Sequence, residues 1–260
     1  MTSSSQMLLA PLLGALIGLA LGMLGGGGSI LTVPMLVYVL RLDAHIAVAT
    51  SLVIVGINAL AGAGMHWREK HVRLKQALLF GAYGIPAAFV GARLSRFLSG
   101  PLLLMLFALL MLVIAALMLR GGAKPQGQGS AAAWWRVMLG GLGVGFLTGF
   151  LGVGGGFLIV PALVLLLGME MPDAVGSSLV VIAINSAAGL AGQMSEAALP
   201  WTLIGIFVVA GLLGLRVGSW ATRWIAPARL RQSFAVFVIA LALVLLAINL
   251  PAVVTAYAAA

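Results

Sequence analysis

Apolar runs of about 20 residues fill almost the whole chain and are separated by short polar or charged segments. A run of this length can cross the hydrocarbon core of a bilayer as one helix. We predict four apolar elements in each half of the chain. In the first half they cover 8–40, 44–67, 74–97 and 101–119, and in the second half 135–167, 174–194, 199–224 and 230–250. The pattern predicts an all-α polytopic membrane protein with about eight transmembrane segments.

The first element of each half is the same glycine-broken sequence. Gly14–Val37 aligns without a gap with Gly141–Val164, at an offset of 127 residues, and 12 of the 24 positions are identical. The similarity continues from Ala47–Gly62 to Ala174–Gly189 at the same offset. Consecutive glycines each cost about 1 kcal/mol in a helix, so we expect the helix to break at 25–28 and at 152–156. The chain is therefore predicted to be a duplication, with repeat 1 in 1–120, a linker in 121–133 and repeat 2 in 134–260.

The charges between the apolar elements distinguish two topologies. If each broken element crosses the membrane once, the repeats are parallel and the basic residues divide seven inside against six outside. If each broken element enters and returns as a hairpin, the repeats are inverted and the division becomes ten against three. Cytoplasmic loops carry an excess of Lys and Arg, so the charge count favours inverted repeats, with Arg73 and Arg229 on the same side.

The composition excludes several classes of function. The chain is 63% hydrophobic and 7% charged, whereas soluble domains carry about 25% charged residues. Its net charge of +9 does not indicate nucleic-acid binding, because the basic residues are divided among loops between apolar elements. With no cysteine, disulfides and thiolate chemistry are excluded. No catalytic motif or metal-ligand spacing stands out, so we expect neither an enzyme nor a cofactor.

Broken helices at matching places in two halves are the best sequence indication of a transport site. A helix that restarts after a break presents free N–H groups and the positive end of its dipole, which suit an anion. We therefore expect the broken segments to bind substrate. Their residues are Gly25, Gly27, Gly28, Ser29, Gly152, Gly154, Gly155 and Gly156. The alternative is that glycines serve close helix packing, as the four-residue spacing of Gly14, Gly18 and Gly22 suggests.

Polar residues inside the apolar elements extend this candidate site. Asn58 and Asn185 are equivalent by the 127-residue offset, and Ser51 and Ser178 lie two turns earlier on the same helix faces. We expect these side chains to bind substrate oxygens; the alternative is hydrogen bonding between helices. Arg216 follows a long apolar run and would favour anions, unless its side chain extends to the membrane interface.

Two further pairs occupy equivalent places near the broken elements. Pro34 and Pro161 remove a backbone donor inside an apolar helix, which predicts a kink beside the site or a plain curvature. Asp43 and Glu170 follow the broken elements and are candidates for coupling transport to protons or sodium, with ordinary loop charges as the alternative.

The duplicated motifs at Gly22–Pro34 and Gly149–Pro161, each followed by a Ser-Leu-rich helix with an asparagine, resemble the TauE/SafE sulfite exporter family. The resemblance covers nearly the whole chain. It implies a transporter of the bacterial or archaeal cytoplasmic membrane that moves sulfite or sulfonates. One departure between the halves is Ser29, where the second repeat has Gly156.

We therefore expect a secondary transporter that moves a sulfur-containing anion by alternating access. An anion channel, or a transporter of another small organic or inorganic anion, is the alternative. The expected partners are a small anionic substrate and the lipid bilayer, without nucleic acid. The sequence leaves the oligomeric state open, and a homodimer is one option.

Overall fold

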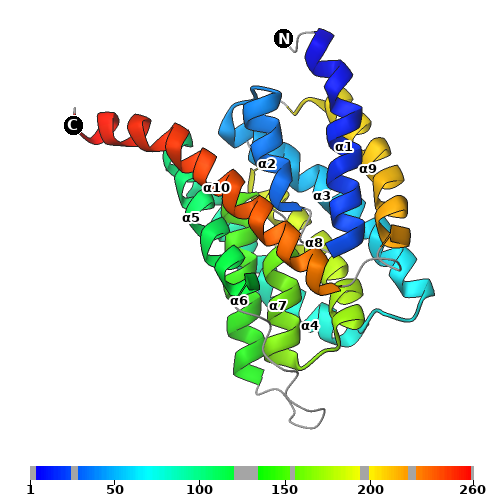
Figure 1. The fold of residues 1–260 in the computed structure, drawn as a ribbon. Coiled ribbons are helices and arrows are strands. Elements are labelled where there is room, and N and C mark those ends of the chain that lie inside the picture. Colours follow the sequence, from blue (N-terminus) through cyan, green and yellow to red (C-terminus); the bar gives the residue numbers. More distant parts are fainter. Residues whose placement is uncertain are drawn as a thin grey trace.

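The computed structural model describes residues 4–24, 29–119, 134–152, 156–193, 199–221 and 227–258. Within these ranges the chain is helical apart from short connections, and it contains no strand. The elements in chain order are α1 (Ser4–Leu24), α2 (Thr32–Pro34), the π-helical turn η2 (Met35–Val39), α3 (Ala44–Arg68), α4 (Leu74–Ser95), α5 (Gly100–Leu119), α6 (Trp134–Leu151), α7 (Gly156–Leu167), α8 (Met171–Gln193), α9 (Trp201–Ala221) and α10 (Pro227–Ala258) (Figure 1). The predicted all-α class is confirmed.

Several of these helices have the length and apolarity of membrane spans. In the described part of the chain, four helices qualify by both criteria: Ala44–Arg68, Leu74–Ser95, Pro172–Gln193 and Trp201–Ala221. Shorter apolar helical stretches lie in α1, α5, α6 and α10. The broken first elements appear as α1 followed by 29–40, and as α6 followed by α7. The predicted linker, 121–133, lies outside the described residues.

The glycine-spaced helices pack across the two repeats. α1 lies against α9, and α6 lies against α4 in the equivalent way. A Cβ atom at Gly18 would overlap the backbone carbonyl of Gly211, and one at Gly145 would overlap that of Gly84. Backbones can approach this closely because neither helix carries a side chain at the crossing. The four-residue glycine spacing therefore serves helix packing in both repeats.

The equivalent helices α3 and α8 pack against each other and run in opposite directions. A Cβ atom at Gly56 would lie 3.1 Å from the Cβ of Ser186, and one at Gly62 would lie 3.1 Å from Leu179. Contacts that advance along α3 therefore move backwards along α8. Two equivalent spanning helices that meet antiparallel are related by a pseudo-twofold axis perpendicular to them, which is the geometry of inverted repeats.

The broken elements form hairpins. Gly14 and Gly22 of α1 face Phe207 and Leu215 of α9, so these helices are parallel. α3 also runs parallel to α9, because Asn58 lies against Gly211 and Gly62 against Leu215. The chain must therefore reverse between α1 and α3, and the helical stretch 29–40 carries it back (Figure 1). In the second repeat α6 and α8 both run parallel to α4, so α7 must return the chain between them.

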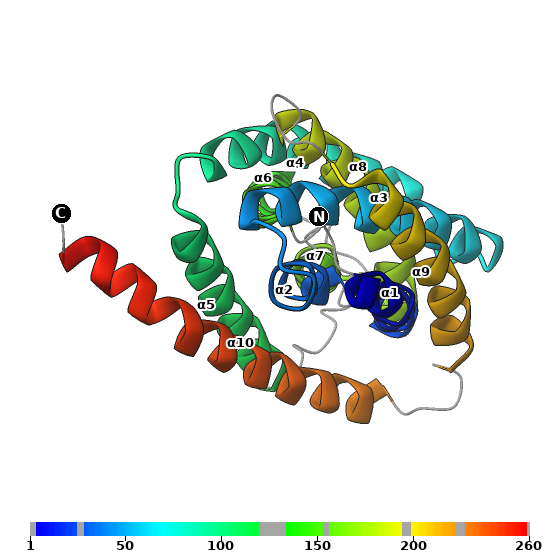
Figure 2. The ribbon, with the colours of Figure 1, turned by 90° about the horizontal axis from the view of Figure 1, so that it is seen from above.

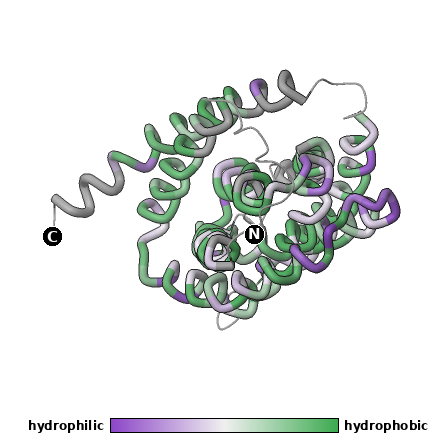
Figure 3. The backbone as a smooth tube through the Cα atoms, turned by 90° about the horizontal axis from the view of Figure 1, so that it is seen from below, coloured by the Kyte–Doolittle hydropathy of each residue, from purple (hydrophilic) through white to green (hydrophobic). Residues whose placement is uncertain are grey.

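The hairpins lie toward the middle of the molecule. Viewed from above, α1, α2, α6 and α7 are surrounded by the other helices, with α5 and α10 side by side along one edge (Figure 2). The helices of the rim are mostly hydrophobic, and hydrophilic residues gather in the loop between α3 and α4 (Figure 3). An apolar rim suits a helical bundle whose outer surface contacts lipid.

Basic residues are concentrated at one end of the molecule, here named the cationic end. Four of them lie where α3 ends and α4 begins: Arg68, Lys70, Arg73 and Lys75. α9 ends and α10 begins at the same end, which brings Arg229 and Arg231 there. The opposite end has Arg41, Arg93 and Arg96. By the positive-inside rule, we expect the cationic end to face the cytoplasm.

Candidate functional site

The two predicted asparagines occupy matching buried positions about halfway along α3 and α8. Asn58 in α3 is 1% exposed, and Asn185 in α8 is 0% exposed. Each amide fits against a glycine of a helix from the other repeat: Asn58 against Gly211, and Asn185 against Gly84. Those glycines are the same ones that form the α1–α9 and α4–α6 crossings. Each asparagine therefore sits at a junction of three helices.

Neither amide has a hydrogen-bond partner among the described residues. The Nδ2 and Oδ1 atoms of both Asn58 and Asn185 are buried and unpaired. A buried polar group without a partner costs about 1–3 kcal/mol, so two such groups at equivalent places are unusual for residues that only join helices. The asparagines therefore offer free donors and acceptors at the level where α3 and α8 meet, but at two separate places: Asn58 against α9 and Asn185 against α4.

Hydroxyl groups extend the polar positions along α3 and α8. The hydroxyls of Thr50, Ser51 and Ser186 are buried without a partner in the described part of the chain. Ser178, equivalent to Ser51, instead donates to the backbone oxygen of Val175 over 2.7 Å. The two repeats thus differ in how many hydroxyls remain unpaired.

Only part of each glycine break lies within the described residues. Gly25, Gly27, Gly28, Gly154 and Gly155 lie outside the described residues. Ser29 is fully buried at the start of the returning stretch, and Gly156 is the first residue of α7 rather than part of the break.

Gly152 shows how the second break begins. Its φ of +69° is a left-handed conformation that favours glycine, and its N–H donates to Thr148 over 3.0 Å to end α6. It packs against the backbone of Val48 in α3. Val48 lies ten residues before Asn58, or about 15 Å along the helix axis. Along α3, the start of this break therefore lies closer to the level of Ser51 than to that of Asn58.

The remaining predicted residues lie apart from the amides. Pro34 precedes the π-helical turn η2, a type of widening that often marks functional sites, whereas Pro161 lies inside the regular helix α7. Asp43 caps α3, accepting from the backbone N of His45 over 2.8 Å. Glu170 is exposed just before α8. Arg216 is exposed on α9, on the face turned away from α1 and α3.

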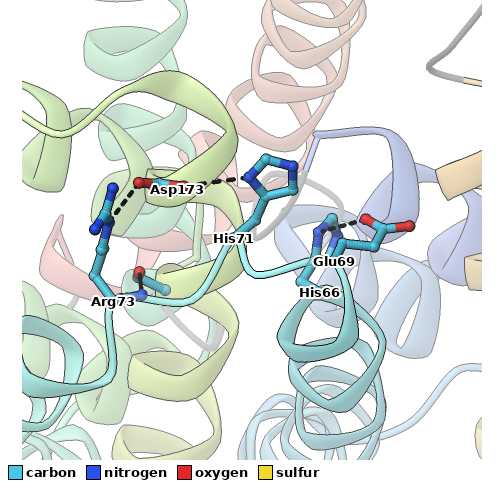
Figure 4. Close-up of polar contacts among 6 residues, drawn as sticks. His66, Glu69, His71, Arg73 and Asp173 are labelled. Carbon is cyan, nitrogen blue, oxygen red and sulfur yellow. Dashed lines mark hydrogen bonds and ion pairs between the residues drawn. The ribbon is translucent and has the colours of Figure 1, made fainter.

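A polar cluster at the cationic end was not predicted from the sequence (Figure 4). Asp173 of α8 is 8% exposed and is the only buried charged side chain in the part of the chain whose burial is described. It accepts from Arg73 Nε over 2.6 Å and lies 3.2 Å from His71 Nδ1. The backbone N of Arg73 also donates to Ser177 Oγ over 2.9 Å. The position equivalent to Asp173 in the first repeat is Ile46. This departure from the repeat was the signal in the sequence that could have singled out Asp173.

A second cluster joins the same two helices at the opposite end. Arg96, just after α4, donates from Nη2 to the backbone oxygen of Gly192 over 2.7 Å. Gln193 Nε2 donates to Ser95 Oγ over 2.9 Å, and both side chains are buried. α4 and α8 are therefore joined by polar contacts at both ends.

Known proteins resemble this chain along most of its length. Residues 10–245 match the family described as Sulfite exporter TauE/SafE. A probable membrane transporter protein of Xylella fastidiosa (strain 9a5c) is 38% identical over 237 residues, covering 88% of this chain and 91% of that protein. YdhB of Bacillus subtilis (strain 168), a probable membrane transporter protein, is 27% identical over 209 residues, covering 78% of this chain and 85% of its own length. No solved structure matches this chain.

The relatives extend beyond bacteria. A probable membrane transporter protein of the archaeon Methanocaldococcus jannaschii is 27% identical over 198 residues, covering 73% of this chain and 74% of that protein. The family description and the names of the relatives indicate membrane transport, which agrees with the apolar helical fold. The chain is a multi-pass membrane protein that belongs to the TauE/SafE sulfite exporter family.

Proposed function

We propose that this protein is a secondary transporter that moves a sulfur-containing anion, sulfite or an organosulfonate, across the cytoplasmic membrane by alternating access. The observation that carries the proposal is the pair of buried, unpaired amides of Asn58 and Asn185 at equivalent positions of α3 and α8. The family description supplies the substrate class.

The chemistry of an amide suits this substrate. Each asparagine carries two N–H donors, and a sulfite or sulfonate group presents three oxygen acceptors. Hydrogen bonds to a charged group are worth about 1.5–3 kcal/mol, which would repay the cost of the unpaired amides. A neutral donor also holds an anion less tightly than a buried cation would. Release on the far side of the membrane is therefore easier.

Inverted repeats supply a physical route to alternating access. When two equivalent halves have opposite orientations, exchanging their conformations turns an outward-facing site into an inward-facing one. Asn58 and Asn185 occupy equivalent positions of the two halves, against α9 and α4, so this exchange would interchange their surroundings.

The proposal is tested by removing each amide in purified protein. We expect Asn58→Ala and Asn185→Ala each to raise the Kd for sulfite at least about tenfold, because a charge-assisted hydrogen bond is lost. Their thermal stability should fall little, because removing a buried polar group without a partner offsets the packing that is lost with the side chain. Binding is measured by calorimetry in detergent and transport by sulfite flux in proteoliposomes.

The matched control is Asn249→Ala in α10. Asn249 is also buried, but its amide donates to Tyr38 and to the backbone oxygen of Leu245. Its removal should lower stability and leave sulfite affinity unchanged. Unaltered affinity in both Asn58→Ala and Asn185→Ala would refute the central amide site.

A further inference from the structure

Two buried hydroxyls of the first repeat differ from their counterparts in the second. Ser51 of α3 and Thr32 of α2 are both 0% exposed, and neither hydroxyl has a hydrogen-bond partner among the described residues. At the 127-residue offset, Ser178 donates to the backbone oxygen of Val175, and Ile159 has no oxygen in its side chain. Buried hydroxyls are rarely left unpaired, so this pair points to a ligand bound at one repeat only.

The end of α6 lies beside Ser51. Gly152, whose N–H closes the last turn of α6, packs directly against the backbone of Val48. Leu52 shares a buried core with Leu151, the last residue of α6. Ser51 lies on the same side of α3 as these two contacts, because it follows Val48 by three residues and precedes Leu52. Its hydroxyl is therefore close to the last turn of α6.

The returning stretch of the first hairpin brings Thr32 to the same part of α3. α2 consists of Thr32–Pro34 and packs against α3. The stretch ends at Leu40 and α3 begins at Ala44, and the two run in opposite directions. Thr32, eight residues before Leu40, therefore lies roughly level with Leu52, eight residues after Ala44. Two unpaired hydroxyls thus approach the end of α6 from two segments of repeat 1.

The last turn of α6 is the negative end of a helix dipole. The final carbonyls of a helix have no partner within it and together carry about half an elementary negative charge. Such an end attracts a cation and repels an anion. Carbonyl and hydroxyl oxygens are ligands for hard cations, and broken transporter helices bind sodium through their C-terminal ends. The sequence predicted that Ser51 binds substrate oxygens, but its place beside α6 favours a cation.

The acidic residues in the described part of the chain lie away from this place. Asp43 and Glu69 flank the two ends of α3, and Glu170 and Asp173 lie at the start of α8. Hydroxyls and backbone carbonyls do not exchange protons near neutral pH. A cation held by these oxygens is therefore a metal ion rather than a proton.

We propose that Ser51, Thr32 and the last turn of α6 form a binding site for one sodium ion, which is transported together with the anion. Ser51 precedes Asn58 by seven residues, or about 10 Å along α3, so the bound cation would attract an anion held at that amide. One ion is expected per chain, because the hydroxyl of Ser178 is already paired and Ile159 lacks an oxygen. The coupling rests on the proposed transport function, whereas the ion binding does not.

Sodium binding in the absence of sulfite tests the site. Replacing choline by sodium at constant ionic strength should raise the melting temperature of the purified protein to a plateau, because a bound ion stabilises the folded state. We expect Ser51→Ala and Thr32→Val each to raise the half-saturating sodium concentration at least about tenfold, since a polar contact to a charge is lost. Ser178→Ala is the matched control and should leave that concentration unchanged. Melting in choline alone reports whether each variant folds.

Flux in proteoliposomes separates the sodium site from the proposed function. We expect an imposed sodium gradient to accumulate sulfite, and a proton gradient with equal sodium on both sides not to. Sodium stabilisation that Ser51→Ala and Thr32→Val both weaken, without sulfite flux, would retain the ion site and reject the proposed substrate. Sulfite flux by a protein that sodium does not stabilise would retain the carrier and reject the ion site. Unchanged sodium dependence in both variants would also overturn it.

Discussion

At the scale of single residues, equivalent positions in the two repeats adopt the same backbone conformation with different residue types. Arg41 and Gly168 both end a returning helix with positive φ, 55° and 65°, and only glycine adopts this conformation without strain. Asp43 begins α3 with a side-chain cap to His45 and Ile46. Asp43 was predicted only as a coupling candidate. Its role as a helix cap could not be predicted, because helix starts are known from sequence only to within a few residues.

The cap of Asp43 leads to a specific expectation. Asp43→Ala should lower the free energy of unfolding by about 1 kcal/mol, because two backbone N–H groups of α3 lose their acceptor. Sulfite flux should persist under both imposed proton and sodium gradients. Thermal unfolding and proteoliposome assays measure the two effects. A variant of native stability that no longer responds to either gradient would instead identify Asp43 as the coupling residue.

At the scale of helices, the glycine spacing predicted the packing faces but not the partners. The repeat of Gly141, Gly145 and Gly149 marks one face of α6, and that face does pack closely. The partner is α4 of the other repeat, which a spacing within one helix cannot specify. The equivalence of Gly84 and Gly211 at the 127-residue offset was a signal in the sequence that could have indicated it.

Gly145 and Gly143 provide a matched pair on α6. Gly145→Leu should prevent folding or strongly destabilise the protein, because its side chain would overlap the backbone of Gly84. Gly143→Leu should be nearly neutral, since nothing lies within 4 Å of a Cβ atom there and the position is exposed. Yield of monodisperse protein and thermal stability in detergent compare the two. Similar behaviour of both variants would contradict the α4–α6 packing.

At the scale of the whole molecule, the inverted arrangement places basic residues from both repeats at one end. The charge count favoured inverted repeats, and the antiparallel contact of α3 and α8 agrees with that topology. The departure of Asp173 from the repeat was a signal in the sequence, but its partners Arg73 and His71 could not be predicted, because they lie about 100 positions away in the other repeat.

Labelling from one side of the membrane checks this topology. Single cysteines replacing Arg73 and Arg229 should react with an impermeant thiol reagent in inside-out vesicles and remain unlabelled in intact cells. A cysteine replacing Arg41 should show the reverse, because Arg41 lies at the opposite end. Labelling of positions 73 and 229 from different sides would rule out the inverted repeats.

The most direct test of the central claim is counterflow of labelled sulfite in proteoliposomes. An alternating-access carrier exposes its site to one side at a time, so unlabelled sulfite inside should drive transient uptake of labelled sulfite above its equilibrium level. Asn58→Ala and Asn185→Ala should weaken this overshoot. Sulfite flux that saturates poorly and shows no overshoot would contradict the carrier mechanism and indicate a channel.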